Sequence, residues 1–240
     1  MALHTLVSRR RPPEIYVPSE CKAKTLEWMY AYEQFKLNLN DRKGLLESFR
    51  MYGASAGQII DAPGSKDGMQ IRIFNCKHST PCVGYGIGYL RKKLKKDFEG
   101  LSGKEIGQLR KDGMNVTEEV YFPKLVFMGD TTAEALYEQE ELLKQYPVII
   151  VECSFLTDEF EERAKKTKHV FYPALRPFIA AHPDTTFVLI HFSKRYSEQE
   201  VADFFLKESL KNIVPWVCPS ANENAGSNGE EEEEEDDYGE

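Results

Sequence analysis

Three side chains that bind metal ions well lie just beyond three short apolar runs of this sequence. They are His78, Asp130 and His191, and the runs that precede them span residues 71–74, 125–128 and 187–190. Short apolar runs are typical of strands buried in a sheet, and ligands commonly bind where such strands end. Two imidazoles and one carboxylate form a ligand set that zinc favours. The pattern therefore predicts a zinc site at one edge of a sheet.

Each of these residues taken alone also fits a structural role. A single His at a strand end is often held by hydrogen bonds within the fold, and Gly129-Asp130 is a common turn sequence. The metal-site prediction therefore depends on the three residues together.

The elements that must position these residues alternate between strands and helices, which favours layered α/β packing. Additional strands are expected over residues 14–17 and 148–151, which are mostly β-favouring. Capping-box sequences begin two of the helices, at Ser102 and Ser197. The predicted helices span residues 19–35, 103–111, 133–145, 168–181 (with interruptions at Pro173 and Pro177) and 198–211.

The charge of the chain is concentrated at its C-terminal end. Residues 221–240 hold ten of the 39 acidic residues and none of the 31 Lys and Arg residues. The rest of the chain is therefore slightly basic, although the net charge is −8, and a basic surface tolerates a phosphate polymer. We expect one domain over residues 1–220 and a disordered acidic tail over residues 221–240.

Cysteine content and hydropathy point to a cytoplasmic or nuclear protein. The five cysteines are scattered, form no CxxC pair and follow no secretory signal, so we expect reduced thiols. No apolar run approaches the roughly 20 residues of a membrane helix, so no membrane association is expected. Residues 8–11 read Ser-Arg-Arg-Arg, which fits a short nuclear signal or an ordinary solvated loop.

Several strings of the sequence together resemble one known family. KHSTPCVGYGI from Lys77, FMGDTT from Phe127 and HFSKRY from His191 resemble, in order, the third to fifth metal motifs of the metallo-β-lactamase superfamily. The string HFSKRY is similar to that of ribonuclease Z, the zinc phosphodiesterase that removes the 3′ trailer from precursor tRNA. PPEIYVP, LSGKEIGQL and VECSFL support the resemblance, which covers about residues 2–215.

The resemblance implies a fold, a metal centre and partners. The fold expected is α/β, a metallo-β-lactamase-type four-layer αββα sandwich. His78, Asp130 and His191 would join the ligands of a further family motif to hold two zinc ions, with Asp130 as the bridging ligand. Precursor tRNA is the expected substrate, and a homodimer is the expected assembly. Ser193, Arg195 and Tyr196 are expected to orient His191.

Two further residues match catalytic positions of the family. His169 lies where the family has the string His-Ser-Thr, and Glu152 lies where it has His-Glu-Ala-Thr. The family's His is thought to protonate the leaving group with an acidic partner, a task that suits an imidazole. Here the strings read His-Val-Phe and Val-Glu-Cys-Ser, so a structural role for both residues stays open.

One family motif, HxHxDH, is absent from the 240 residues. It supplies four metal ligands and the expected catalytic base, and it should precede residues 2–6. We therefore expect an N-terminally incomplete fold and a chain that is inactive or nearly so. The alternative is a non-catalytic degenerate homologue that serves as an RNA or protein interaction module. A third possibility is a metallo-hydrolase that acts on a small phosphodiester or ester.

The most basic segment, residues 90–96, has two interpretations. Its five positive side chains fit either contact with RNA phosphates or a solvated strand edge protected by lysines. Only about 45 residues separate Tyr85 from Asp130, so we expect no counterpart of the bulky arm with which some ribonucleases Z grip tRNA.

Overall fold

The computed structural model describes residues 12–37, 49–62, 65 and 67–217. Its main element is a seven-stranded sheet in which the strands are hydrogen-bonded in sequence order. Residues 8–11 and the predicted tail 221–240 lie outside the described residues, so the division into domain and tail stays a prediction. The strands are β3 (Ile59–Asp61), β4 (Met69–Cys76), β5 (Cys82–Leu94), β6 (Thr117–Phe127), β7 (Val148–Glu152), β8 (Thr186–Ile190) and β9 (Ile213–Pro215).

The first part of this sheet is antiparallel and the second part is parallel. Each strand from β3 to β6 runs opposite to the strand before it, whereas β6 to β9 run in the same direction. Parallel neighbours need crossover connections, and helices supply them here. These helices are α5 (Ala133–Tyr137), α6 (Glu140–Leu143), α7 (Glu161–Thr167), α8 (Tyr172–Ala181) and α9 (Glu198–Leu206).

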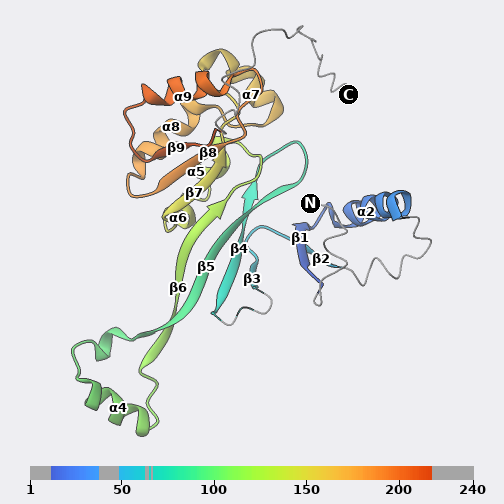
Figure 1. Ribbon diagram of the computed structural model, residues 1–240. Coiled ribbons are helices and arrows are strands. Elements are labelled where there is room, and N and C mark those ends of the chain that lie inside the picture. The colour runs from blue at the N-terminus through green and yellow to red at the C-terminus, as the bar shows by residue number, and fades with distance from the viewer. Residues whose placement is uncertain (1–11, 38–48, 63–64, 66, 218–240) are drawn as a thin grey trace, which may run out of the picture.

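Four of these helices, α5, α6, α8 and α9, cover one face of the sheet and form the main core with it (Figure 1). Alternate strand residues point into this core, as the period of a strand requires. Val126 and Val151 are fully buried there, together with Leu136 and Phe178 from the helices. The α/β packing predicted from the sequence is confirmed.

A second, two-stranded sheet packs on the opposite face. It consists of β1 (Glu14–Pro18) and β2 (Arg50–Ala54), which are parallel and connected through α2 (Lys22–Leu37). Tyr16 and Ala54 pack against Ile73 of the main sheet, whereas Ile15 packs against Met29 of α2. Helices, main sheet, small sheet and α2 thus follow one another in the expected αββα order.

The small sheet covers only the β3–β5 end of the main sheet. On the same face, a cross-strand row continues through Phe127, Ile150, Val188 and Val214. Phe127 is 45% exposed and Val214 is 44% exposed. Within the described residues, the β6–β9 end of this face is therefore apolar and incompletely covered.

Strands β5 and β6 continue beyond the sheet as a two-stranded ribbon that carries α4 (Gly103–Lys111) at its far end (Figure 1). The ribbon is narrow and ends in one short helix, and the expectation of no counterpart to the bulky arm of some ribonucleases Z stays a prediction. The pairing register places Lys92 opposite Glu119 and Lys93 opposite Glu118. Opposite charges across a strand pair favour the structural interpretation of the basic segment.

Two of the predicted helices are divided differently in the structure, and α2, α8 and α9 begin or end at other residues than expected. The helix expected over 133–145 breaks into α5 and α6 at Gln139, whose side chain bonds both backbone groups of Asn75 at the edge of β4. The segment with two prolines forms one helix, α8. Pro173 lies in its first turn, where no N–H bond is lost, and Pro177 lies inside the helix without ending it. The capping boxes at Ser102 and Ser197 are confirmed.

Candidate active site

The predicted site residues lie together at one edge of the main sheet. Strands β4, β6, β7 and β8 all run in the same direction, so their carboxyl ends meet at this edge. The residues that follow these ends, or end the strand itself, are His78, Asp130, Glu152 and His191. The loop between α7 and α8 adds His169.

Two overlapping groups of potential metal ligands form at this edge. His78, Asp130 and His169 have ligand atoms that all lie within 4.8 Å of one another, and the same holds for Glu152, His169 and His191. The ring of His169 lies between the other two imidazoles, with centroid distances of 4.7 Å to His78 and 5.3 Å to His191. Two of the three predicted metal ligands therefore share a group, and His169, predicted for proton transfer, joins it to the third.

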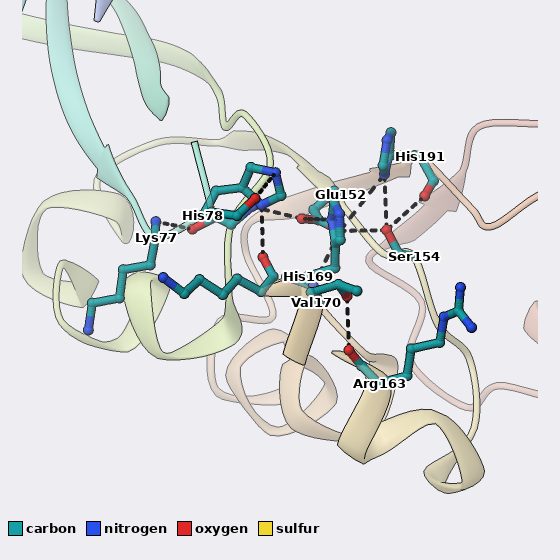
Figure 2. A network of polar contacts seen from close by, with 12 residues as sticks. Lys77, His78, Glu152, Ser154, Arg163, His169, Val170 and His191 are labelled. Carbon is teal, nitrogen blue, oxygen red and sulfur yellow. Dashed lines mark hydrogen bonds and ion pairs between the residues drawn. The ribbon is translucent and has the colours of Figure 1, made fainter. Parts of the chain in front are cut away.

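Glu152 is the most buried of these residues, with 1% of its surface exposed. Its carboxylate accepts hydrogen bonds from the backbone N–H of Thr131 at 2.7 Å and of Val170 at 3.2 Å, and from the Ser154 hydroxyl at 2.7 Å. The Nδ1 atom of His169 lies 2.8 Å from its Oε1 atom (Figure 2). A buried carboxylate needs such partners, since each compensates for lost hydration.

His169 is positioned by a backbone turn and by its hydrogen bond to Glu152. The left-handed backbone of Lys168, with φ of 56°, turns the chain out of α7 and delivers His169 to the site. The hydrogen bond to Glu152 raises the pKa of His169 above its usual value, against the opposing effect of partial burial. A larger fraction of this imidazole is therefore protonated near neutral pH.

His78 and His191 have different supports. The Nδ1 atom of His78 lies 3.2 Å from the carbonyl oxygen of Lys168. His191 has a positive φ of 60°, and its Nδ1 atom lies 3.0 Å from the hydroxyl of Ser154 (Figure 2). Ser154 thus links His191 to Glu152.

The residue that orients His191 is not among those predicted. Arg195 bonds the Ser193 hydroxyl, and the Tyr196 hydroxyl accepts from the backbone of Leu156, so these side chains have other tasks. The role of Ser154 was missed. Its position two residues after Glu152 was the available signal, because such residues point to the same side of an extended chain.

Two thiols adjoin the site. Cys76 and Cys82 face each other across the β4–β5 pair. The hydrogen bond between them raises the pKa of Cys76 and lowers the pKa of Cys82 to about 7. The four cysteines within the described residues are free.

The donor set at this edge suits a metal ion. Imidazole nitrogens and carboxylate oxygens are zinc ligands, with bond lengths of about 2.0–2.2 Å. Each group of three has the compactness that shared coordination needs after small side-chain movements. His78 and Asp130 therefore fit the metal centre that the family resemblance implies, and His191 adjoins them through His169 in the second group.

Comparison with known proteins identifies relatives of one kind, although no family model matches the sequence. The chloroplastic tRNase Z TRZ2 of Arabidopsis thaliana is 29% identical over 212 residues, which cover 85% of this chain and 56% of that protein. The tRNase Z TRZ1 of the same plant is 29% identical over 198 residues, which cover 81% of this chain and 67% of that protein. The chain therefore spans between about half and two thirds of the length of these relatives. The resemblance to ribonuclease Z is confirmed.

Solved structures that resemble this chain were also found. They include the metallo-β-lactamase-fold protein YhfI of Bacillus subtilis, with a TM-score of 0.49, 13% identity and coverage of 88% of this chain and 65% of that chain. The short form of human tRNase Z has a TM-score of 0.45 and 14% identity, and the match covers 78% of this chain and 62% of that chain. Among the described residues, none of the helices combines the length and hydropathy needed to cross a membrane.

Proposed function

We propose, on the premise that this chain is a homologue of the tRNase Z proteins, that it is a zinc-dependent phosphodiesterase domain for the 3′ end of precursor tRNA. The observation that carries the proposal is the hydrogen bond between Glu152 and His169, directly beside His78 and Asp130. A pair of this kind next to a metal-ligand group fits hydrolysis of a phosphodiester.

In this proposal His78, Asp130 and His191 hold the metal. Zinc bound there would lower the pKa of a water molecule and neutralise charge on the phosphate. Asp130 would offer its carboxylate oxygens to the metal centre. The hydroxyl of Ser154 lies within hydrogen-bond distance of His191 Nδ1 and so fixes the imidazole ring. Outer partners of this kind keep a ligand in the orientation that metal binding needs.

His169 then serves as the proton donor to the leaving oxygen. Its raised pKa keeps the imidazolium populated near neutral pH, and Glu152 stabilises that charged form through Nδ1. The Nε2 atom of His169 is then left to donate its proton to the substrate. Glu152 itself is inaccessible to a substrate because it is buried, so it acts through His169.

The 240-residue chain alone is expected to cleave poorly, because it lacks the HxHxDH string that supplies the other ligands and the base. The experiment supplies this chain with the HxHxDH-bearing half of Arabidopsis TRZ1 and measures trailer removal from a precursor tRNA. Cleavage is expected with both parts, and its loss in Asp130→Ala identifies the active site as this one. Cleavage by the chain alone, abolished by Asp130→Ala, contradicts the expected inactivity.

The absence of HxHxDH also favours a second candidate, a non-catalytic module that binds RNA or protein. Metal content measured by mass spectrometry separates the two. About two zinc ions per complete site, reduced in Asp130→Ala, are expected for the enzyme. No zinc and no cleavage with the added half support the module. The dimer predicted from the family is tested in the same samples by light scattering.

A further inference from the structure

A cleft of about 430 Å³ opens beside the imidazoles of His169 and His191. His169 and His191 form the wall that it shares with the candidate active site, whereas His78 and Asp130 do not line it. The volume lies in the range of small-molecule sites, about 300–1,000 Å³. The cleft therefore has room for a ligand group beyond the one that the metal ligands hold.

Three cations line this cleft, and no acidic side chain does. They are Arg163 and Lys166, one turn apart on α7, and Arg195, which follows β8. Within the described part of the chain, none of the three forms an ion pair with a carboxylate. Lys165, between the first two in sequence, is by contrast paired with Glu161 and Glu162. The positive charges without a carboxylate partner on this part of the surface therefore lie in the cleft.

Arg195 is already oriented for binding. Its Nε atom donates to the Ser193 hydroxyl at 2.9 Å, and its guanidinium carbon lies 4.7 Å from the ring centre of Phe160. This arrangement leaves the two terminal nitrogens to form a fork, which matches two oxygens of a phosphate. Arg163 extends from α7 on the same side as Ser154 and His191 (Figure 2).

We propose that this cleft is a phosphate subsite, in which Arg163, Lys166 and Arg195 bind a backbone phosphate of the RNA strand next to the scissile one. The ligand class rests on the proposed function. The subsite would hold the strand across His191 and His169, so that the scissile phosphate lies over the metal ligands. Three positive charges without carboxylate partners favour a phosphodiester, since each releases a counterion from the RNA.

The test measures binding and not cleavage, so that it stands apart from the test of the proposed function. A fluorescein-labelled short single-stranded oligoribonucleotide is titrated with the full 240-residue chain in EDTA, and the anisotropy is followed at several salt concentrations. Arg163→Gln and Arg195→Gln are each expected to weaken binding by about five- to tenfold. Each should also reduce the slope of log affinity against log salt by about 0.7.

Two variants control for charge and geometry. Lys165→Gln makes the same charge change on the same helix outside this cleft, and its affinity is expected within about twofold of the wild type. Arg195→Lys keeps the charge but loses the fork, so it should preserve the salt slope and weaken binding by less than Arg195→Gln. Circular dichroism checks that each variant is folded.

The proposal is overturned if the wild type binds no RNA, if the two Arg→Gln variants bind as the wild type does, or if Lys165→Gln weakens binding equally. Loss of binding in both Arg variants, with a silent Lys165→Gln, supports it. A chain that binds through this cleft but does not cleave even with the added HxHxDH-bearing half would keep the subsite and refute the phosphodiesterase. Cleavage, together with unaltered RNA binding in the Arg variants, would refute the subsite and keep the phosphodiesterase.

Discussion

Glu152 and His169 are joined by a hydrogen bond of 2.8 Å between Oε1 and Nδ1, although one ends a strand and the other precedes a helix. The other three hydrogen bonds to the carboxylate come from Thr131, Ser154 and Val170. This one buried group therefore fixes the loops after β6, β7 and α7 relative to one another. The site and the stability of this edge depend on the same carboxylate.

Glu152→Gln should destabilise the chain by about 2–4 kcal/mol, because an amide cannot accept all four hydrogen bonds and its NH₂ group would face other donors. Urea denaturation at pH 7 measures the change in the free energy of unfolding. Glu138→Gln is the control: Glu138 is an exposed carboxylate paired with Lys77, so its loss should cost less than about 1 kcal/mol. Equal effects of the two substitutions would show that the buried network contributes little.

The pair also predicts a pH dependence of stability. The pKa of His169 is raised in the folded chain, so its contribution is fully present below the unfolded value of about 6.5 and is lost as the pH rises through the folded value. NMR titration of the imidazole in EDTA measures that value, which Glu152→Gln should lower. The difference in unfolding free energy between wild type and His169→Gln should shrink with rising pH. A difference that grows with pH would contradict the assigned charge state.

Ser154→Ala should weaken zinc binding by about 10–100-fold, since it removes the hydroxyl that orients His191. Calorimetric titration with zinc measures the affinity. Ser193→Ala removes a hydroxyl of the same loop region that bonds Arg195 instead, so its zinc affinity should match that of the wild type. Equal zinc affinity in Ser154→Ala and wild type would exclude Ser154 from this role.

Gly86→Ala should cost about 1–3 kcal/mol through overpacking. A methyl group there would lie 2.6 Å from both the Phe74 ring and the Tyr146 hydroxyl, in the core between sheet and helices. Gly107→Ala makes the same change on α4, where nothing lies within 4 Å, and should add about 0.5–1 kcal/mol of stability. Thermal unfolding of both variants measures this difference in stability. Unchanged stability in Gly86→Ala would show that the core around Gly86 can accommodate a methyl group.

Much of the architecture follows from local sequence. Apolar runs predicted the strands that end near His78, Asp130 and His191, and serine capping boxes predicted the starts of α4 and α9. These features depend on neighbouring residues, which the sequence contains. The break in the predicted helix at Gln139 could not be foreseen, because its cause is a bond to Asn75 on a distant strand.

The sequence by itself determined which side chains at the strand ends could bind a metal, and the family motifs they belong to. The tertiary structure alone decided how they group: His169 lies between His78 and His191, Ser154 holds His191, and Arg163 and Arg195 face one cleft. The physical reason is that parallel strands bring their ends to one edge whatever their distance along the chain. Which side chains then touch is set by loop geometry and by the partners a buried carboxylate must find.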